Sequence, residues 1–229
     1  MPERFRVEIA PSQSVTAIAY PATEPTRGNV TLILGHGAGA DQTSSFMVTF
    51  ASGLSARGID TVTFNFLYTE QERRVPDPNG RLEACYRAVI ETVRNRMSGD
   101  QRLAIGGKSM GGRIASQVAA AGCGDLAGLV FLGYPLHPPG RVDRLRAAHL
   151  SLVMAPMLFI QGTRDAFGTP DELQPIINPL APSAELYAVE GGDHSFKVQK
   201  RARVEQQDVY RAIQDRIEMW LRAAVRTER

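Results

Sequence analysis

The sequence predicts an α/β protein with a mostly parallel sheet and helices on both faces. Short apolar and β-branched runs alternate with longer stretches of helical period, which is typical of strands joined by crossover helices. The first two runs, 5–10 and 15–20, are joined by only four residues, so we expect an antiparallel hairpin at the sheet edge. No repeat or linker divides the chain, and we expect a single domain over residues 1–229.

Six further runs have the length and composition of buried parallel strands, which brings the expected sheet to about eight strands. They are Val30–Leu34, Thr61–Phe66, Arg102–Gly106, Gly128–Gly133, Met157–Gln161 and Glu185–Val189.

Helical periodicity between and after these strands predicts five helices. They are 43–57, 82–97, 110–121, one that begins near Pro170, and a last one that carries an apolar stripe from 210 to 221. Gly58 is expected to end the first helix. Asp77-Pro78 and Gly99 are expected to mark the two ends of the second.

Composition and charge exclude several classes of protein. The chain is 43% hydrophobic, as expected of an ordinary globular domain. Its net charge is only +2 and its basic residues are scattered, so nothing indicates nucleic-acid binding. The apolar runs fall far short of the roughly 18 residues of a membrane span, and the N-terminus lacks the pattern of a secretory signal. We therefore expect a cytoplasmic protein with no membrane partner, whose Cys85 and Cys123 stay reduced.

The first chemical signal is the G-x-S-x-G segment 107–111, whose serine is Ser109. It stands between an apolar strand and a helix of small residues, which is the context that a nucleophile elbow requires. The flanking glycines leave room for a sharp turn, and the helix dipole behind Ser109 favours a developing negative charge. A glycine-rich turn without chemistry is the alternative, but the position directly after a strand favours a nucleophile.

A serine nucleophile needs a base within reach, and the chain has four histidines. His194 follows the last strand and precedes the last helix, which places it at the same sheet edge as Ser109 and completes the order serine, acid, histidine. For His36 we expect a structural hydrogen bond beneath the site. His137 also lies in a loop just after a strand, and His149 lies in a polar stretch.

A third residue, a carboxylate that orients the imidazole of the histidine, is expected between Ser109 and His194 in the sequence. Asp165 follows the strand at 157–161, so it projects from the edge where ligands bind in open α/β sheets. The alternative is that Asp165 caps the helix near Pro170, although Asp171 lies nearer to that helix. Asp193 is interpreted as a residue that shapes its loop.

Backbone donors for an oxyanion are expected next to the serine. The amide of Met110, directly after Ser109, is the first candidate. The second is expected from the glycine-rich loop 35–39, where missing side chains let the backbone approach a substrate. Ala38 is the preferred donor in this loop, with Gly37 as the other possibility.

Two phosphate-binding patterns fail on position. The segment 107–109 resembles the end of a Walker A loop, but the first glycine of that motif would fall at Arg102. The loop 35–40 fits a relaxed dinucleotide fingerprint, which requires an acid about 20 residues later, where the sequence has Asn65 and Phe66. We therefore expect no organic cofactor and no metal.

Together these segments resemble the α/β-hydrolases, and within them the small, lid-poor, dienelactone-hydrolase-like group of mostly uncharacterised bacterial proteins. The resemblance covers nearly the whole chain and rests on 36–39, 107–113, 162–165 and 192–196, in the family's order. It implies the α/β-hydrolase fold, with Ser109, Asp165 and His194 as the triad. Dienelactone hydrolases themselves use cysteine where this chain has serine, so their substrate is not carried over.

Two segments bear on the substrate. About 20 residues, 136–155, occupy the usual place of a lid, which is too short for a large one, so we expect an open site suited to short acyl groups. In the loop Tyr68–Gly80, Arg73 or Arg74 could hold a substrate carboxylate. The alternative is internal pairing of these arginines with Glu70, Glu72 or Asp77.

These observations predict a serine hydrolase that cleaves a carboxylic ester or thioester through an acyl-enzyme on Ser109. The expected partner is a small acyl substrate, and the chain is expected to be a monomer or a homodimer. Lys108, beside the nucleophile, is hypothesised to anchor a neighbouring loop. The alternative function is a catalytically silent hydrolase-like binding or scaffold module, which predicts a blocked or misaligned Ser109.

Overall fold

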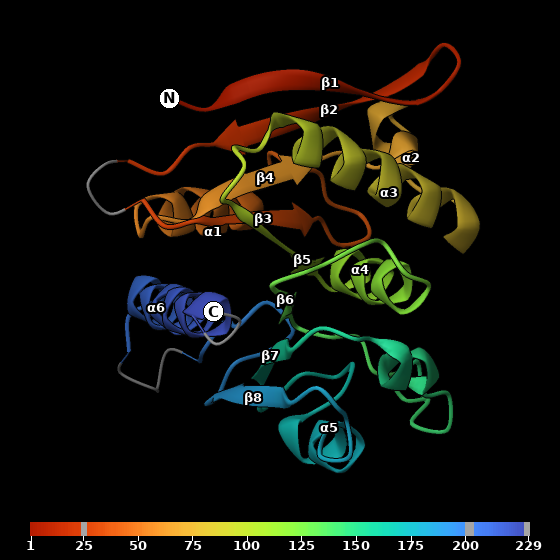
Figure 1. Cartoon of the computed structure of the whole chain (residues 1–229). Coiled ribbons are helices and arrows are strands. Elements are labelled where there is room, and N and C mark those ends of the chain that lie inside the picture. The colour runs from red at the N-terminus through yellow and green to blue at the C-terminus, as the bar shows by residue number, and fades with distance from the viewer. Residues whose placement is uncertain (24–26, 200–203, 227–229) are drawn as a thin grey trace.

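Eight strands form one sheet in the computed structural model, which describes residues 1–23, 27–199 and 204–226 (Figure 1). The strand order is β1-β2-β4-β3-β5-β6-β7-β8. The pairs β1–β2 and β2–β4 are antiparallel, and the remaining pairs are parallel. The strands are β1 Glu3–Ala10, β2 Gln13–Tyr20, β3 Val30–Gly35, β4 Asp60–Phe64, β5 Arg102–Lys108, β6 Gly128–Leu132, β7 Met157–Gly162 and β8 Ala184–Val189.

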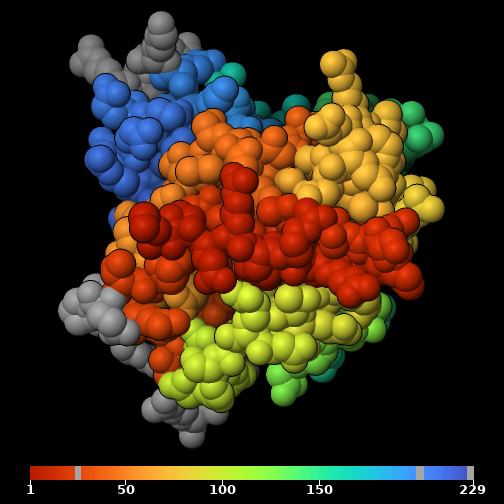
Figure 2. All heavy atoms as spheres, turned by 90° about the horizontal axis from the view of Figure 1, so that it is seen from above, coloured from red at the N-terminus to blue at the C-terminus, as the bar shows by residue number. Residues whose placement is uncertain are grey.

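The sheet matches the predicted eight strands, including the N-terminal hairpin. Figure 2 looks onto that edge and shows the hairpin, in red, exposed along its length, with α3 (Asn79–Arg96) along one flank. The parallel register places Gly35 of β3 beside Gly107 of β5, at the carboxyl edge of the sheet. Two glycines on neighbouring strands therefore lie side by side at the sheet edge where the sequence predicts the functional site.

Helices cover both faces of the sheet (Figure 1). On one face lie α1 (Ser45–Ser55) and α6 (Gln206–Arg226), and on the other lie α3 and α4 (Met110–Ala120). The helix α5 (Pro170–Ile177) packs beside β8. None of the described helices combines the length and apolar character that crossing a bilayer requires.

Two local expectations differ from the structure. The helix α3 ends at Arg96, where Met97 turns to an extended conformation, so Gly99 is not its cap. Part of the predicted loop Tyr68–Gly80 belongs to a short helix, α2 (Leu67–Glu70). The expectation that residues 136–155 form no large lid is confirmed, because their regular structure is limited to a short 3₁₀-helix, η1 (Ala148–Leu152).

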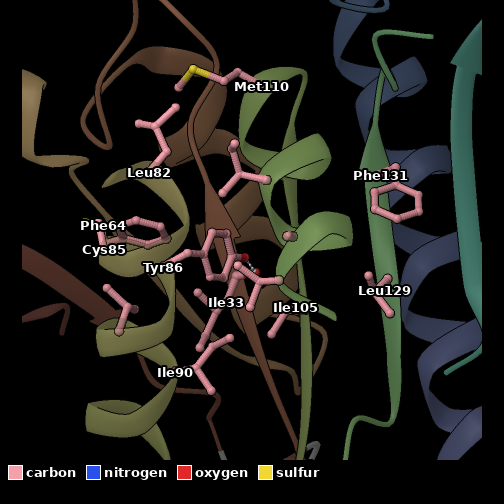
Figure 3. Packing of buried hydrophobic residues seen from close by; sticks show 14 of the residues in the cluster. Ile33, Phe64, Leu82, Cys85, Tyr86, Ile90, Ile105, Met110, Leu129 and Phe131 are labelled. Atoms are coloured by element: carbon pink, nitrogen blue, oxygen red, sulfur yellow. Dashed lines mark hydrogen bonds between the residues drawn. The ribbon is translucent and has the colours of Figure 1, made fainter. Parts of the chain in front are cut away.

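The core forms two main layers, one on each face of the sheet. Figure 3 shows the layer beneath α3 and α4, where Tyr86 of α3 reaches the sheet among Ile33, Phe64 and Ile105. The Tyr86 hydroxyl lies 2.7 Å from the carbonyl oxygen of Gly106 and 3.1 Å from that of Ile33. This fully buried side chain therefore ties α3 to β3 and β5 just below the site.

Candidate active site

Ser109 occupies a strained turn between β5 and α4. Its φ is +50° and its ψ is −113°, a backbone conformation that non-glycine residues rarely adopt. A Cβ atom at Gly107 would lie 2.3 Å from the carbonyl oxygen of Gly35, and one at Gly111 would lie 2.2 Å from the same atom. Only glycines let α4 start this close to β3, and this close approach holds the turn in place.

Three side chains from three separate segments form a hydrogen-bonded chain. The Oγ of Ser109 lies 2.8 Å from Nε2 of His194. The Nδ1 of the same ring lies 2.7 Å from Oδ2 of Asp165. The carboxylate accepts a hydrogen bond from Nδ1–H, which leaves Nε2 free to accept the proton of Ser109. The structure thus brings together the three residues that the sequence analysis singled out.

Gln161, in β7, positions the carboxylate of Asp165. Both side chains are buried, and Nε2 of Gln161 donates to Oδ2 of Asp165 at 2.8 Å. The amide of Gln161 is fixed in turn, because its Oε1 accepts from the backbone N–H of Tyr134 at 2.8 Å. The other carboxylate oxygen, Oδ1, accepts from the N–H of Phe167 at 2.8 Å. The sequence analysis missed Gln161, although a glutamine in an otherwise apolar strand was a signal.

The ring and loop of His194 are held from several sides. The ring of Phe167 lies 4.2 Å from the imidazole, centroid to centroid. Oδ1 of Asp193 accepts from the N–H groups of Ser195 and Lys197, at 2.8 and 2.9 Å, so Asp193 shapes the loop as expected. The imidazole therefore has little freedom to leave Ser109.

Lys108 joins the strand of the nucleophile to the loop of the histidine. Its ammonium group donates to the carbonyl oxygen of His194 at 2.5 Å, which is the loop anchoring that the sequence suggested. Burial lowers the pKa of Lys108 to about 8, while the charges of Asp165 and Asp193 act in the opposite direction.

The two residues predicted to supply oxyanion donors both lie at the site. Ala38 and Met110 line the same cavity as Ser109, and within the described part of the chain neither backbone N–H donates to a protein acceptor. His36 belongs to the same loop as Ala38, and its side chain is fully buried. Its Nδ1 lies 2.9 Å from the carbonyl oxygen of Gly37, and its Nε2 accepts a hydrogen bond from the N–H of Phe66 at 3.2 Å. Burial lowers the pKa of His36, so its neutral ring supports the loop.

The cavity over Ser109 has a volume of about 550 Å³, within the range of small-molecule sites. Arg73 and Arg74 do not line it; they border a separate depression beside Tyr68. Arg73 instead donates to Oδ1 of Asp77 at 2.7 Å, which is the internal pairing considered above as the alternative.

Other polar side chains line the cavity in place of those arginines. They are Arg113 of α4, Arg146 of the segment before η1, and Asp77, whose buried Oδ2 has no hydrogen-bond partner in the described part of the protein. The sequence analysis did not identify these residues as parts of the site. Among the described residues, no group of three or more His, Cys, Asp or Glu side chains is arranged to hold a metal ion.

Comparisons with known proteins agree with this architecture. A serine hydrolase homologue from Coxiella burnetii superposes with a TM-score of 0.74 at 20% identity, covering 94% of this chain and 96% of that chain. An α/β serine hydrolase from Xanthomonas campestris, described as without lid, gives 0.73 at 23% identity, covering 96% and 94%. Dienelactone hydrolase from Anabaena variabilis gives 0.74 at 18% identity, covering 97% and 98%.

At these identities the likeness concerns the fold, and it confirms the lid-less, dienelactone-hydrolase-like architecture that the sequence suggested. Family membership is shown by the sequence itself, because a family described as "Alpha/beta hydrolase domain" matches residues 28–222. The chain therefore belongs to the α/β hydrolase domain family.

Proposed function

We propose that this protein is a serine hydrolase that cleaves a carboxylic ester or thioester of a small or short-acyl substrate. The observation that carries the proposal is the continuous chain from Ser109 Oγ through His194 to Asp165, with links of 2.8 and 2.7 Å. Such distances are those of a nucleophile already hydrogen-bonded to its base. Cytoplasmic location and a monomeric or homodimeric state remain part of the same proposal.

In the first half of the reaction, Oγ of Ser109 attacks the substrate carbonyl while Nε2 of His194 takes the hydroxyl proton. Asp165 holds the ring in the required tautomer and stabilises the imidazolium. The negative charge that forms on the carbonyl oxygen meets the N–H groups of Ala38 and Met110. The carbon–oxygen or carbon–sulfur bond then breaks, and His194 returns the proton to the leaving group.

In the second half, a water molecule takes the place of the leaving group. His194 removes a proton from this water as it attacks the acyl-enzyme carbonyl, and Ser109 leaves with the proton returned by the same ring. The product is the free carboxylic acid. No step requires a group beyond these side chains, backbone amides and water.

The alternative, a silent binding or scaffold module, predicts a blocked or misaligned Ser109. Ser109 lines an open cavity, and its Oγ lies within hydrogen-bond distance of His194. Both features support the enzyme over the module.

Fluorophosphonate labelling tests this proposal, because the probe phosphonylates activated serines. We expect an adduct on the peptide that contains Ser109, and parallel hydrolysis of 4-nitrophenyl acetate. Ser109→Ala should lose both signals, while Ser195→Ala, in the neighbouring loop of the same cavity, should keep the adduct on Ser109. Well-folded protein that neither reacts with the probe nor hydrolyses the ester would favour the binding module.

A further inference from the structure

We propose that the substrate carries a carboxylate and that Arg113 and Arg146 bind it within the cavity of Ser109. The inference rests on the proposed function for its catalytic half, since it names the substrate class of that site. The binding half, recognition of a carboxylate by two guanidinium groups, is measurable by itself.

Arg113 is fixed next to the nucleophile by the helix. It follows Ser109 by four residues, and its backbone N–H donates to the carbonyl oxygen of Ser109 at 3.0 Å. Residues four apart lie on the same face of an α-helix, roughly 6 Å apart along its axis. Arg113 therefore lines the same cavity as Ser109, one helical turn beyond it.

The contacts of the Arg113 side chain leave its charge without a counter-ion. Its guanidinium donates to the amide oxygens of Asn79 at 3.2 Å and Gln117 at 3.3 Å, and both acceptors are neutral. Within the described residues, it forms no ion pair. Glu83 exerts a favourable field on Arg113 from farther away. Both arginines line the cavity, and burial first and the charge of Arg146 second lower the pKa of Arg113, so the two positive charges repel each other.

Arg146 is held in place by its backbone. Its N–H donates to the carbonyl oxygen of Leu136 at 2.8 Å, and its own carbonyl accepts from the hydroxyl of Tyr134 at 2.7 Å. The side chain is exposed, lines the cavity and makes no ion pair with a carboxylate in the described part of the chain. A carboxylate placed between the two arginines would relieve their repulsion and accept several charge-assisted hydrogen bonds.

The remaining charges of the cavity point the same way. Lys108 is a third cation, whose charge Asp165 and Asp193 offset, and Asp77 is the one acidic residue among the described residues that line the cavity. The charge of Asp77 is already matched by Arg73 at 2.7 Å, with Arg81 at 3.9 Å. The cavity therefore keeps an excess of positive charge, which favours an anionic ligand over a neutral one.

A matched pair of esters tests the proposal. Mono-4-nitrophenyl glutarate and 4-nitrophenyl valerate share an acyl chain of the same length and differ by a carboxylate in place of a methyl group. We expect a kcat/KM at least tenfold higher for the glutarate ester. In Arg113→Gln the ratio of the two values should fall by roughly 10- to 100-fold, the loss expected for hydrogen bonds to a charged group. Arg146→Gln should lower it less, because that side chain is more exposed.

Two variants separate charge from fold. Arg113→Lys keeps the positive charge and should restore part of the preference for the glutarate ester. Arg144→Gln removes an exposed cation close to Arg146 in the sequence that does not line the cavity, and it should leave both values of kcat/KM unchanged.

A second pair, 4-carboxyphenyl acetate and phenyl acetate, places the carboxylate on the leaving group. A preference there, lost in Arg113→Gln, supports the proposal and assigns the anion to that side.

Glutarate binding to Ser109→Ala, measured by calorimetry, separates recognition of a carboxylate from hydrolysis of an ester. Binding that Arg113→Gln weakens tenfold or more in this background supports carboxylate recognition, even if no ester is hydrolysed and the proposed function fails. Hydrolysis of the neutral esters without preference for either anionic ester, together with no glutarate binding, overturns the inference while the proposed function stands. Absence of both hydrolysis and binding overturns both.

Discussion

Two sets of side chains share one cavity and are built differently. The serine group consists of Lys108, Ser109, His194 and Asp165; each of its polar ends is hydrogen-bonded to another part of the protein. The arginine group consists of Arg113, Arg146 and Asp77, and its charged ends have few partners. The proposed roles explain this difference: groups that act on the reacting bond would be fixed before the substrate arrives, whereas groups that recognise the substrate would be completed by it.

The two buried aspartates show this contrast with the same residue type. Asp165 is 2% exposed and accepts hydrogen bonds on both oxygens, from His194, Gln161 and Phe167. Asp77 is 5% exposed and accepts only on Oδ1, from Arg73. A carboxylate oxygen buried without a donor is a cost that an incoming hydroxyl or water could remove.

The largest effect is expected at Asp165. Asp165→Asn keeps the shape of the side chain but removes the charge that holds the tautomer of His194, so kcat for 4-nitrophenyl acetate should fall about 10⁴-fold. Asp171→Asn, in the exposed first turn of α5, is the control and should leave kcat unchanged. A decrease of tenfold or less in a correctly folded Asp165→Asn protein would remove the distinction between the two groups.

The next effect concerns the backbone that supports Ser109. In Gly111→Ala the added methyl group would lie 2.2 Å from the carbonyl oxygen of Gly35, so the helix must shift. We expect the free energy of unfolding to fall by about 3 kcal/mol. Gly80→Ala, in the first turn of α3 with open space around its Cβ position, should be neutral or slightly stabilising. Urea unfolding measures both, and equal stabilities would show that this close approach is not required.

A smaller effect is expected at Lys108, a positioning residue. Lys108→Met removes the hydrogen bond to the carbonyl of His194, so kcat should fall about tenfold with little change in KM. Lys197→Met, an exposed lysine in the loop of His194, is the control. Unchanged kcat in Lys108→Met would mean that the loop holds itself without this anchor.

Lys108 also predicts a pH dependence of stability. The pKa of its ammonium group is 10.5 in the unfolded chain and about 8 in the folded protein. Between these values the unfolded chain binds more protons, so the free energy of unfolding should rise with pH in this window, by roughly 1 kcal/mol per pH unit. Lys108→Met should lack this rise in urea titrations at pH 7.5, 8.5 and 9.5. Parallel curves for the two proteins would contradict the buried charge.

The smallest effect is expected at Asp77. In Asp77→Asn the free energy of unfolding should change by less than about 1 kcal/mol, because the main loss is the pairing with the partly exposed Arg73. Urea unfolding against the wild type provides the measurement. A loss above about 2 kcal/mol would mean that Asp77 is as firmly integrated as Asp165 and that the arginine group is structural.

The sheet and the serine group were accessible from the sequence because their signals are local. Short apolar runs indicate strands without knowledge of their partners in the sheet. The glycines at 107 and 111 indicate a close backbone approach at a sharp turn. The predicted helix end at Gly99 was wrong, because a glycine signal alone does not define a cap and α3 already ends at Arg96. The catalytic roles of Ser109, Asp165 and His194 stay predictions, although the structure brings the three together.

The arginine group was not accessible, because its chemistry depends on which segments meet. Arg113 stands in the quoted motif 107–113, but its significance comes from Arg146, 33 residues later, and from the neutral partners Asn79 and Gln117. Arg73 has the charge expected of a residue that binds a substrate carboxylate, but it donates to Asp77 and is therefore paired within the protein. Gln161 is a different case, because its partner Asp165 is only four residues away and a glutamine in an otherwise apolar strand was a local signal that was overlooked.

The most direct test of the central claim, that the serine group forms an acyl-enzyme on Ser109, is a rapid-quench measurement with 4-nitrophenyl acetate. Intact mass and peptide mapping at early times would follow the acyl group. We expect a burst of nitrophenolate that approaches one equivalent per protein where deacylation limits turnover, together with an acetyl group on the peptide that contains Ser109 at the same early times. Sustained hydrolysis by Ser109→Ala at the wild-type rate, with no acetyl group on Ser109 in the wild type, would contradict it.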